Sequence, residues 1–188
     1  MRCQLCLNFS WQPICKECLD RLFVPTPKKR VLQDGLNVYS CYAYKDIKEL
    51  LHTKHTLIGS KVFSILTRHA LLPLTQNFKC KDIFSIPIDD HTREGYSHSA
   101  IIAYELRTVF TPLYGALRAK NRVRYSGQKR DFRMKQKRDF RLTCKEGISV
   151  VLVDDIVTSG STLLEANATC KKGGVDVAFA LCLADASG

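Results

Sequence analysis

Apolar and polar residues along this chain form two alternating patterns, one typical of strands and one typical of amphipathic helices. Apolar runs rich in β-branched and aromatic residues predict strands over 36–44, 82–88, 148–153 and 175–183. Apolar residues spaced three and four apart predict helices over 46–55, 60–72, 97–110 and 161–172. Strands that alternate with helices build a mostly parallel sheet, so we expect an α/β fold with helices on both faces of that sheet.

The first 35 residues do not follow this pattern. Two Cys-x-x-Cys pairs separated by eight residues place four thiols close together in the chain: Cys3, Cys6, Cys15 and Cys18. Four thiolates suit one tetrahedral ion and favour zinc over harder metals, and redox-active cysteine pairs are the alternative. We expect a zinc finger over 1–22 that needs structural Zn²⁺ to fold, with Trp11 covering its small core or stacking on a base. A proline-containing linker over 23–35 then leads to an α/β domain over 36–188.

The strand predicted over 148–153 leads into residues that suit a sugar-phosphate ligand. Four apolar residues predict a strand buried on both faces, so Asp154 and Asp155 are expected at its carboxyl end, where open parallel sheets bind ligands. The next turn offers hydroxyls, a glycine that lets the backbone approach a phosphate, and the free amides of a helix N-terminus. The residues expected at the phosphate are Thr158, Ser159, Gly160, Ser161 and Thr162. An ordinary helix cap beside two unrelated acids is the alternative.

Residues 150–162, Val-Val-Leu-Val-Asp-Asp-Ile-Val-Thr-Ser-Gly-Ser-Thr, resemble the 5-phosphoribosyl-1-diphosphate (PRPP) binding motif of type I phosphoribosyltransferases. The resemblance implies that Asp154 and Asp155 contact the ribose hydroxyls and are the candidate catalytic residues. It also implies that residues 158–162 hold the 5′-phosphate, and that Mg²⁺ accompanies PRPP. The expected fold is therefore similar to that of type I phosphoribosyltransferases.

Charge is concentrated in one segment. The formal net charge is +11, and residues 118–141 contain eleven basic and only two acidic side chains. The basic residues are Arg118, Lys120, Arg122, Arg124, Lys129, Arg130, Arg133, Lys135, Lys137, Arg138 and Arg141. Tyr125, Phe132 and Phe140 lie between these cations and suit stacking on unpaired bases. We expect a mobile segment that binds single-stranded DNA, with closure over PRPP or a solvated charge run as the alternatives.

The cysteine pairs followed by the sugar-phosphate motif resemble the ComF (ComFC) family of competence proteins over the whole chain. This resemblance implies a cytoplasmic factor of natural transformation that binds incoming single-stranded DNA and carries a PRPP pocket. Phosphoribosyl transfer to an unknown acceptor is the alternative, and the sequence does not establish turnover. A DNA-translocation helicase or an inner-membrane channel is a further candidate partner, which leaves peripheral association with the inner face of the inner membrane open.

One turn departs from the family pattern. Where the family usually has Arg-Gly-Phe-Asn-Gln, this chain has Glu-Gly-Tyr-Ser-His over residues 94–98. Arg93 stands one position ahead and is a candidate for the missing positive charge; a solvated pair with His98 at the start of a helix is the alternative. No apolar run is long enough for a membrane span, and residues 1–6 lack the apolar run of a signal peptide. We therefore expect a cytosolic protein.

Overall fold

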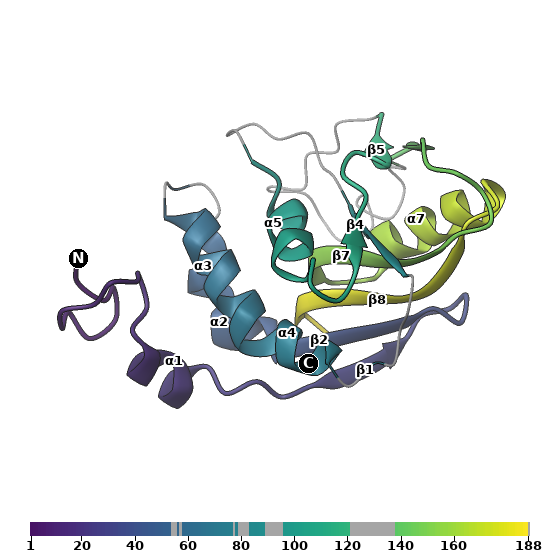
Figure 1. The fold of residues 1–188 in the computed structure, drawn as a ribbon. Coiled ribbons are helices and arrows are strands. Elements are labelled where there is room, and N and C mark those ends of the chain that lie inside the picture. Colours follow the sequence, from purple (N-terminus) through teal and green to yellow (C-terminus); the bar gives the residue numbers. More distant parts are fainter. Residues whose placement is uncertain are drawn as a thin grey trace.

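The computed structural model describes residues 1–53, 56, 58–76, 78, 83–88, 96–120 and 138–187. A six-stranded sheet with the order β1-β2-β8-β7-β3-β4 forms its centre (Figure 1). The strands are β1 (Lys28–Val31), β2 (Asn37–Ala43), β3 (Phe84–Pro87), β4 (Thr111–Pro112), β7 (Ser149–Val157) and β8 (Asp176–Asp185). Among the described strands of this sheet, only β1 is antiparallel to its neighbour; the other pairings in the sheet are parallel. The predicted mostly parallel sheet is confirmed.

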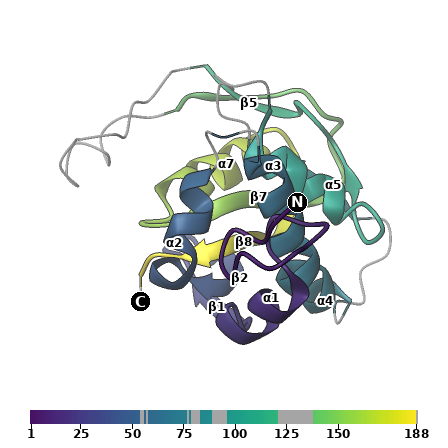
Figure 2. The same cartoon turned by 90° about the vertical axis from the view of Figure 1, so that its left-hand side faces the viewer.

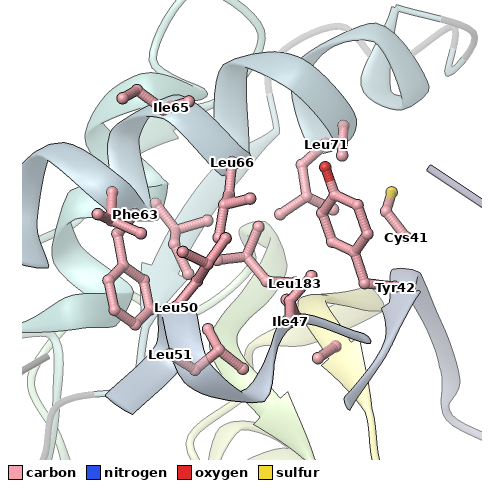
Figure 3. Close-up of a cluster of buried hydrophobic side chains, with 14 of the residues drawn as sticks. Cys41, Tyr42, Ile47, Leu50, Leu51, Phe63, Ile65, Leu66, Leu71 and Leu183 are labelled. Atoms are coloured by element: carbon pink, nitrogen blue, oxygen red, sulfur yellow. The ribbon is translucent and has the colours of Figure 1, made fainter. Parts of the chain in front are cut away.

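Helices cover both faces of this sheet because the central strands are apolar on both sides. Val151 and Val153 of β7 belong to one buried cluster, whereas Val150 and Leu152 belong to the other. Figure 3 shows part of the first cluster, packed between the sheet and its helices. On that side lie α2 (Tyr44–His52), α3 (Gly59–Leu66), a π-helical turn η2 (Thr67–Leu71), α4 (Leu72–Thr75) and α5 (His98–Glu105). On the other side lies α7 (Ser161–Lys172).

Two helices differ from the prediction. The helix expected over 60–72 widens into the π-helical turn, in which the amide of Leu72 donates to the carbonyl of Thr67. Pro73 follows directly; it has no amide to donate and its ring crowds the carbonyl four residues earlier, which explains the local departure from α-helical bonding. The helix expected over 97–110 ends at Glu105, and turns lead from there into β4.

The stretch expected to be a linker, residues 23–35, contributes an edge strand. Arg30 pairs with Val38 and Lys28 with Ser40 in the antiparallel ladder between β1 and β2. A tight hairpin follows, in which Leu32 and Leu36 are joined by a backbone hydrogen bond of 2.9 Å. The sheet therefore begins before residue 36.

The N-terminal cysteine-rich loop and α1 (Lys16–Leu22) pack against the helices of the first cluster (Figures 1 and 2). Ile14 is fully buried, and Leu19 and Phe23 are nearly so; all three join the apolar cluster of the main body. His69 Nδ1 lies 3.9 Å from Asp20 Oδ1 across the same contact. Folding of the N-terminal module is thus coupled to the main core by shared burial.

Candidate sugar-phosphate site

The candidate acids lie within a longer strand than predicted. β7 continues through Asp154 and Asp155 to Val157, pairing with β8 all the way, whereas its other neighbour, β3, ends opposite Val153. The chain leaves β3 towards β4 and leaves β7 in the opposite direction, towards β8. In open α/β sheets ligands bind beyond the carboxyl ends of strands where the connections diverge in this way. The acids therefore occupy the position that this topology favours for a ligand.

Burial and the neighbouring charges change the ionisation of Asp154. Burial, together with the charge of Asp155, raises the pKa of Asp154 to about 8, and the charge of Arg138 opposes both effects. Asp154 keeps partial solvent access, and its Oδ1 accepts a hydrogen bond of 2.9 Å from the amide of Asp155. Asp154 therefore holds its proton more readily than a solvated carboxyl group does.

Arg138 lies against this acidic pair and not on the surface. The residue is only 8% exposed, and its backbone amide donates to Glu165 Oε2 at 3.0 Å. Burial lowers the pKa of its guanidinium, while the charges of Asp154, Asp155 and Glu165 act against that shift. The amide of Asp139 donates to the second oxygen of Glu165 at 2.7 Å, which fixes this end of the basic segment to α7. In this position Arg138 is not available to a DNA strand at the surface, contrary to the prediction.

The loop after β7 ends in glycine and leads directly into α7. Gly160 is the N-cap residue of α7, has a φ of +81°, and provides no capping side chain. The left-handed backbone favours glycine, and a Cβ at this position would lie 2.7 Å from Leu32 Cδ2, so a larger residue would have to displace that side chain. Ser159 Oγ instead contacts Ser161 Oγ at 3.1 Å. Ser159 Oγ also accepts a hydrogen bond of 3.4 Å from the amide of Ser161, the first residue of α7. One loop hydroxyl therefore caps the helix weakly, as the ordinary-cap alternative expects.

Two residues near this loop had no signal in the sequence. Arg30 of β1 donates through Nη1 to the carbonyl oxygen of Thr158 at 2.7 Å, and Leu32 fills the space behind Gly160. Neither residue lies in a recognisable motif, and Arg30 stands 128 positions before Thr158. Their role depends on the β1 ladder, which composition alone did not indicate.

The turn over residues 94–98 is described only in part. Residues 89–95, which include Arg93 and the first two positions of the divergent turn, lie outside the described residues. Ser97 is the N-cap of α5 and accepts from the amide of Ala100 at 3.2 Å. The ring of His98 is 5.0 Å from that of Phe63 and 5.1 Å from that of Tyr96. His98 is therefore half-buried and in contact with two aromatic rings.

Both ends of the basic segment form a two-stranded ribbon, β5 (Leu117–Ala119) and β6 (Phe140–Leu142). Arg118 and Arg141 stand directly opposite each other in it, and both are exposed, whereas Lys120 pairs with Asp139 at 3.2 Å. Phe140 is only 6% exposed and packs in the core, so the prediction that it stacks on bases is wrong. Tyr125, Phe132 and the remaining predicted DNA contacts lie outside the described residues: Arg122, Arg124, Lys129, Arg130, Arg133, Lys135 and Lys137.

The four N-terminal cysteines meet as predicted. Their sulfur atoms all lie within 4.8 Å of one another, and Cys6 Sγ is 3.7 Å from Cys15 Sγ. Sulfurs about 2.3 Å from a tetrahedral zinc ion are separated by roughly 3.8 Å, so this donor set fits such an ion. A hydrogen bond with Cys15, together with burial, raises the pKa of the Cys18 thiol to about 12. Burial opposes ionisation of Cys3, yet backbone amides that donate to its sulfur lower its pKa to about 6.

Trp11 does not cover the core of this module. It is 86% exposed and meets the ring of Phe9, itself 71% exposed, edge to face at 5.2 Å. The apolar interior comes instead from Ile14 and from the contact with the main body. Covering of the module's core by Trp11 was therefore a wrong prediction.

Within the described ranges, every helix is too short or too polar to cross a bilayer. No protein-family model matches the chain, and no curated protein does.

The fold is similar to that of several phosphoribosyltransferases of known structure. An adenine phosphoribosyltransferase from Thermoanaerobacter pseudethanolicus matches with 14% identity and a TM-score of 0.46, over 90% of this chain and 87% of that one. An orotate phosphoribosyltransferase from Aeropyrum pernix matches with 18% identity and a TM-score of 0.41, over 90% and 80%. A UMP synthase from Leishmania donovani has 15% identity and a TM-score of 0.43; the match covers 90% of this chain but only 30% of that one. Since these TM-scores are below 0.5, the function has to be inferred from the site itself.

Proposed function

We propose that this protein binds PRPP with Mg²⁺ at the turn between β7 and α7, and single-stranded DNA through its basic segment. It would act in the cytoplasm as a competence factor of natural transformation. The N-terminal four-cysteine module would hold a structural zinc ion and offer a docking surface to a translocation helicase or a channel at the inner face of the inner membrane. The sugar-phosphate pocket is the part of this proposal with the strongest structural support.

One observation carries the pocket: an acidic pair and a glycine-capped helix N-terminus lie together where the β3 and β7 connections diverge. Carboxylates accept hydrogen bonds from ribose hydroxyls, while helix amides and loop hydroxyls donate to a phosphate. Mg²⁺ bound to the diphosphate would add positive charge near the acids. A ligand with hydroxyls at one end and a phosphate at the other satisfies both halves of the site.

Calorimetric titration with PRPP and Mg²⁺ tests the pocket. Asp155→Asn removes a charge without changing size, so we expect it to weaken PRPP binding by at least tenfold, as for loss of a charge-assisted hydrogen bond. Asp176→Asn is the matched control because Asp176 lies at the opposite end of the parallel strands, at the start of β8. Equal affinities for wild type and Asp155→Asn would rule the pocket out.

The DNA proposal rests on charge. Arg118 and Arg141 are exposed cross-strand partners, and like charges directly opposite each other destabilise a ladder unless an anion lies between them. They stand at the two ends of a segment with nine excess positive charges, more than one diphosphate requires. Binding to a DNA backbone should weaken with salt by roughly 0.7 log units of affinity per log unit of salt for each phosphate contact.

Charge reversal tests this proposal by fluorescence anisotropy with a labelled single strand. The variant changes Lys129, Arg130, Arg133 and Lys135 to glutamate and spares the buried Arg138. We expect loss of most DNA affinity at moderate salt and a shallower salt dependence.

The matched control reverses four exposed lysines elsewhere, Lys45, Lys48, Lys171 and Lys172, which gives the same net charge. Similar losses in both variants would show a non-specific effect of net charge and would contradict a DNA site in the basic segment. Repeating the titration with PRPP present also measures any coupling between the two ligands.

Enzymatic transfer of phosphoribose from PRPP is the second candidate. The burial of Arg138 beside the acidic pair favours it, since fixed positive charge near the reacting group stabilises a departing diphosphate. Asp154 and Asp155 would orient the ribose. Release of diphosphate from PRPP in the presence of a panel of nucleobases tests this role, with Asp155→Ala as the inactive control. PRPP binding without turnover would indicate a ligand sensor.

A further inference from the structure

Arg30 joins the edge of the sheet to the loop at the candidate phosphate site. Its Nη1 lies 2.7 Å from the carbonyl oxygen of Thr158 and 3.3 Å from Asp185 Oδ1. Asp185, the last residue of β8, is 3% exposed, and its Oδ1 also accepts from the amide of Ser187 at 2.8 Å. The side chain of Arg30 is 25% exposed. A buried carboxylate therefore fixes the guanidinium in the place where it meets the loop.

The contact at Thr158 determines the direction of the next amide. In a trans peptide the C=O and the following N–H point in opposite directions, and the described residues contain no cis peptide bond. With its carbonyl held by Arg30, Thr158 turns the amide of Ser159 away from β1. Leu32, two residues after Arg30, closes the space behind Gly160. Thr158 and Ser159 remain exposed, so these two contacts leave the loop a solvent-facing side for a ligand.

This orientation of the Thr158–Ser159 peptide favours an anion at the loop. A carbonyl oxygen that faced the ligand would repel a phosphate, whereas an amide attracts it. Arg30 satisfies that oxygen on the far side of the loop. The main sheet does not depend on this bond, because β1 is already paired with β2 from Lys28 to Val31.

We propose that Arg30, fixed by Asp185, is a positioning residue that holds loop 158–162 in the conformation that binds the 5′-phosphate of the sugar. The inference rests on the proposed PRPP pocket and assigns the β1 strand a part in it. Arg30 itself need not touch the ligand, since it acts through the peptide between Thr158 and Ser159.

The test has to remove Arg30 without leaving a buried charge unpaired. Within the described residues, Asp185 Oδ2 is buried and has no hydrogen-bond partner, so Arg30→Ala alone would destabilise the protein. We therefore compare the double variant Arg30→Ala/Asp185→Asn with the single variant Asp185→Asn. The single variant retains Arg30, which makes the contact with Thr158. Lys29→Ala, one residue away on an exposed position of β1, is the external control.

Two measurements on these variants decide the proposal. Titration with PRPP and Mg²⁺ should show about tenfold weaker binding in the double variant than in Asp185→Asn, with Lys29→Ala close to wild type. Hydrogen exchange of residues 158–162 without ligand should be faster in the double variant, at a similar melting temperature. PRPP affinities within twofold of each other and unchanged local exchange would overturn the proposal.

The exchange measurement separates this inference from the proposed function. If the wild-type protein does not bind PRPP, the proposed pocket is wrong. The role of Arg30 is tested independently of that result: equal hydrogen exchange of residues 158–162 in the double variant and in Asp185→Asn would refute it. Should the double variant not fold, Arg30→Lys replaces it, because a lysine ends about one bond short of the Nη1 position. We then expect severalfold weaker PRPP binding, and wild-type affinity would refute the proposal.

Discussion

Gly160 offers a quantitative test of how the candidate phosphate loop is held. In Gly160→Ala the left-handed backbone, with φ of +81°, costs about 1–2 kcal/mol for any residue with a Cβ. The new Cβ would also stand 2.7 Å and 3.0 Å from the two methyl groups of the buried Leu32. Overpacking of this kind costs about 1–3 kcal/mol, and the lower part of that range applies because the methyl groups end a flexible side chain. The expected total is about 2–4 kcal/mol.

A glycine with the same backbone but free space isolates the steric part. Gly147 has φ of +75°, and a Cβ added there would meet nothing within 4 Å, so Gly147→Ala should cost only the backbone part, about 1–2 kcal/mol. The loss of chain entropy in the unfolded state is the same for both substitutions and cancels in the difference. Equilibrium urea unfolding of each variant, with a common slope, measures the two free energies.

A double-mutant cycle with Leu32→Ala completes the test. Leu32→Ala removes the methyl groups that the new Cβ would meet, so Gly160→Ala should then cost no more than Gly147→Ala. The coupling free energy should be about 1 kcal/mol or more. A cost for Gly160→Ala equal to that for Gly147→Ala, or a cycle without coupling, would refute the packing of β1 behind the loop.

Three further outcomes are expected. Cys15→Ser, or removal of zinc by a chelator, should lower the melting temperature by more than about 5 °C, because the N-terminal module shares the main core. Metal analysis should show that Cys15→Ser loses zinc and that the control variant Cys144→Ser retains it. Asp154 binds its proton more tightly in the folded state, with a pKa of about 8, so stability should fall as pH rises from about 4 to 8. Urea unfolding should show a loss of at most about 6 kcal/mol over this range, and Asp154→Asn should not show it. Arg68→Ala should lower the free energy of unfolding by about 1–3 kcal/mol, because Glu105, which is only 8% exposed, loses two hydrogen bonds of 2.7 and 3.0 Å. An equal decrease when Arg68→Ala is made in a Glu105→Gln background would contradict this cause.

Local patterns in the sequence determined the elements whose signals lie within a few residues of one another. The alternation of strands and helices predicted a mostly parallel sheet, and the structure confirms it. The limits of α7, 161 to 172, followed from its apolar spacing and the glycines that end it. Two Cys-x-x-Cys pairs were enough to predict that four sulfurs meet. These features depend on hydrogen bonds and ligand spacing of short range, so the residues that define them are neighbours in the chain.

Only the tertiary structure decided which side chains complete the site. Arg30 meets Thr158 across 128 positions, and Arg138 reaches the acidic pair because Glu165 of α7 binds the adjacent amides. In sequence both arginines were ordinary members of basic stretches, one in a supposed linker and one among candidate DNA contacts. Burial of Phe140 and exposure of Trp11 were equally hidden, since an aromatic residue suits a core or a surface and the neighbouring elements decide which. Such contacts depend on how the sheet twists and packs, information that no short stretch of residues contains.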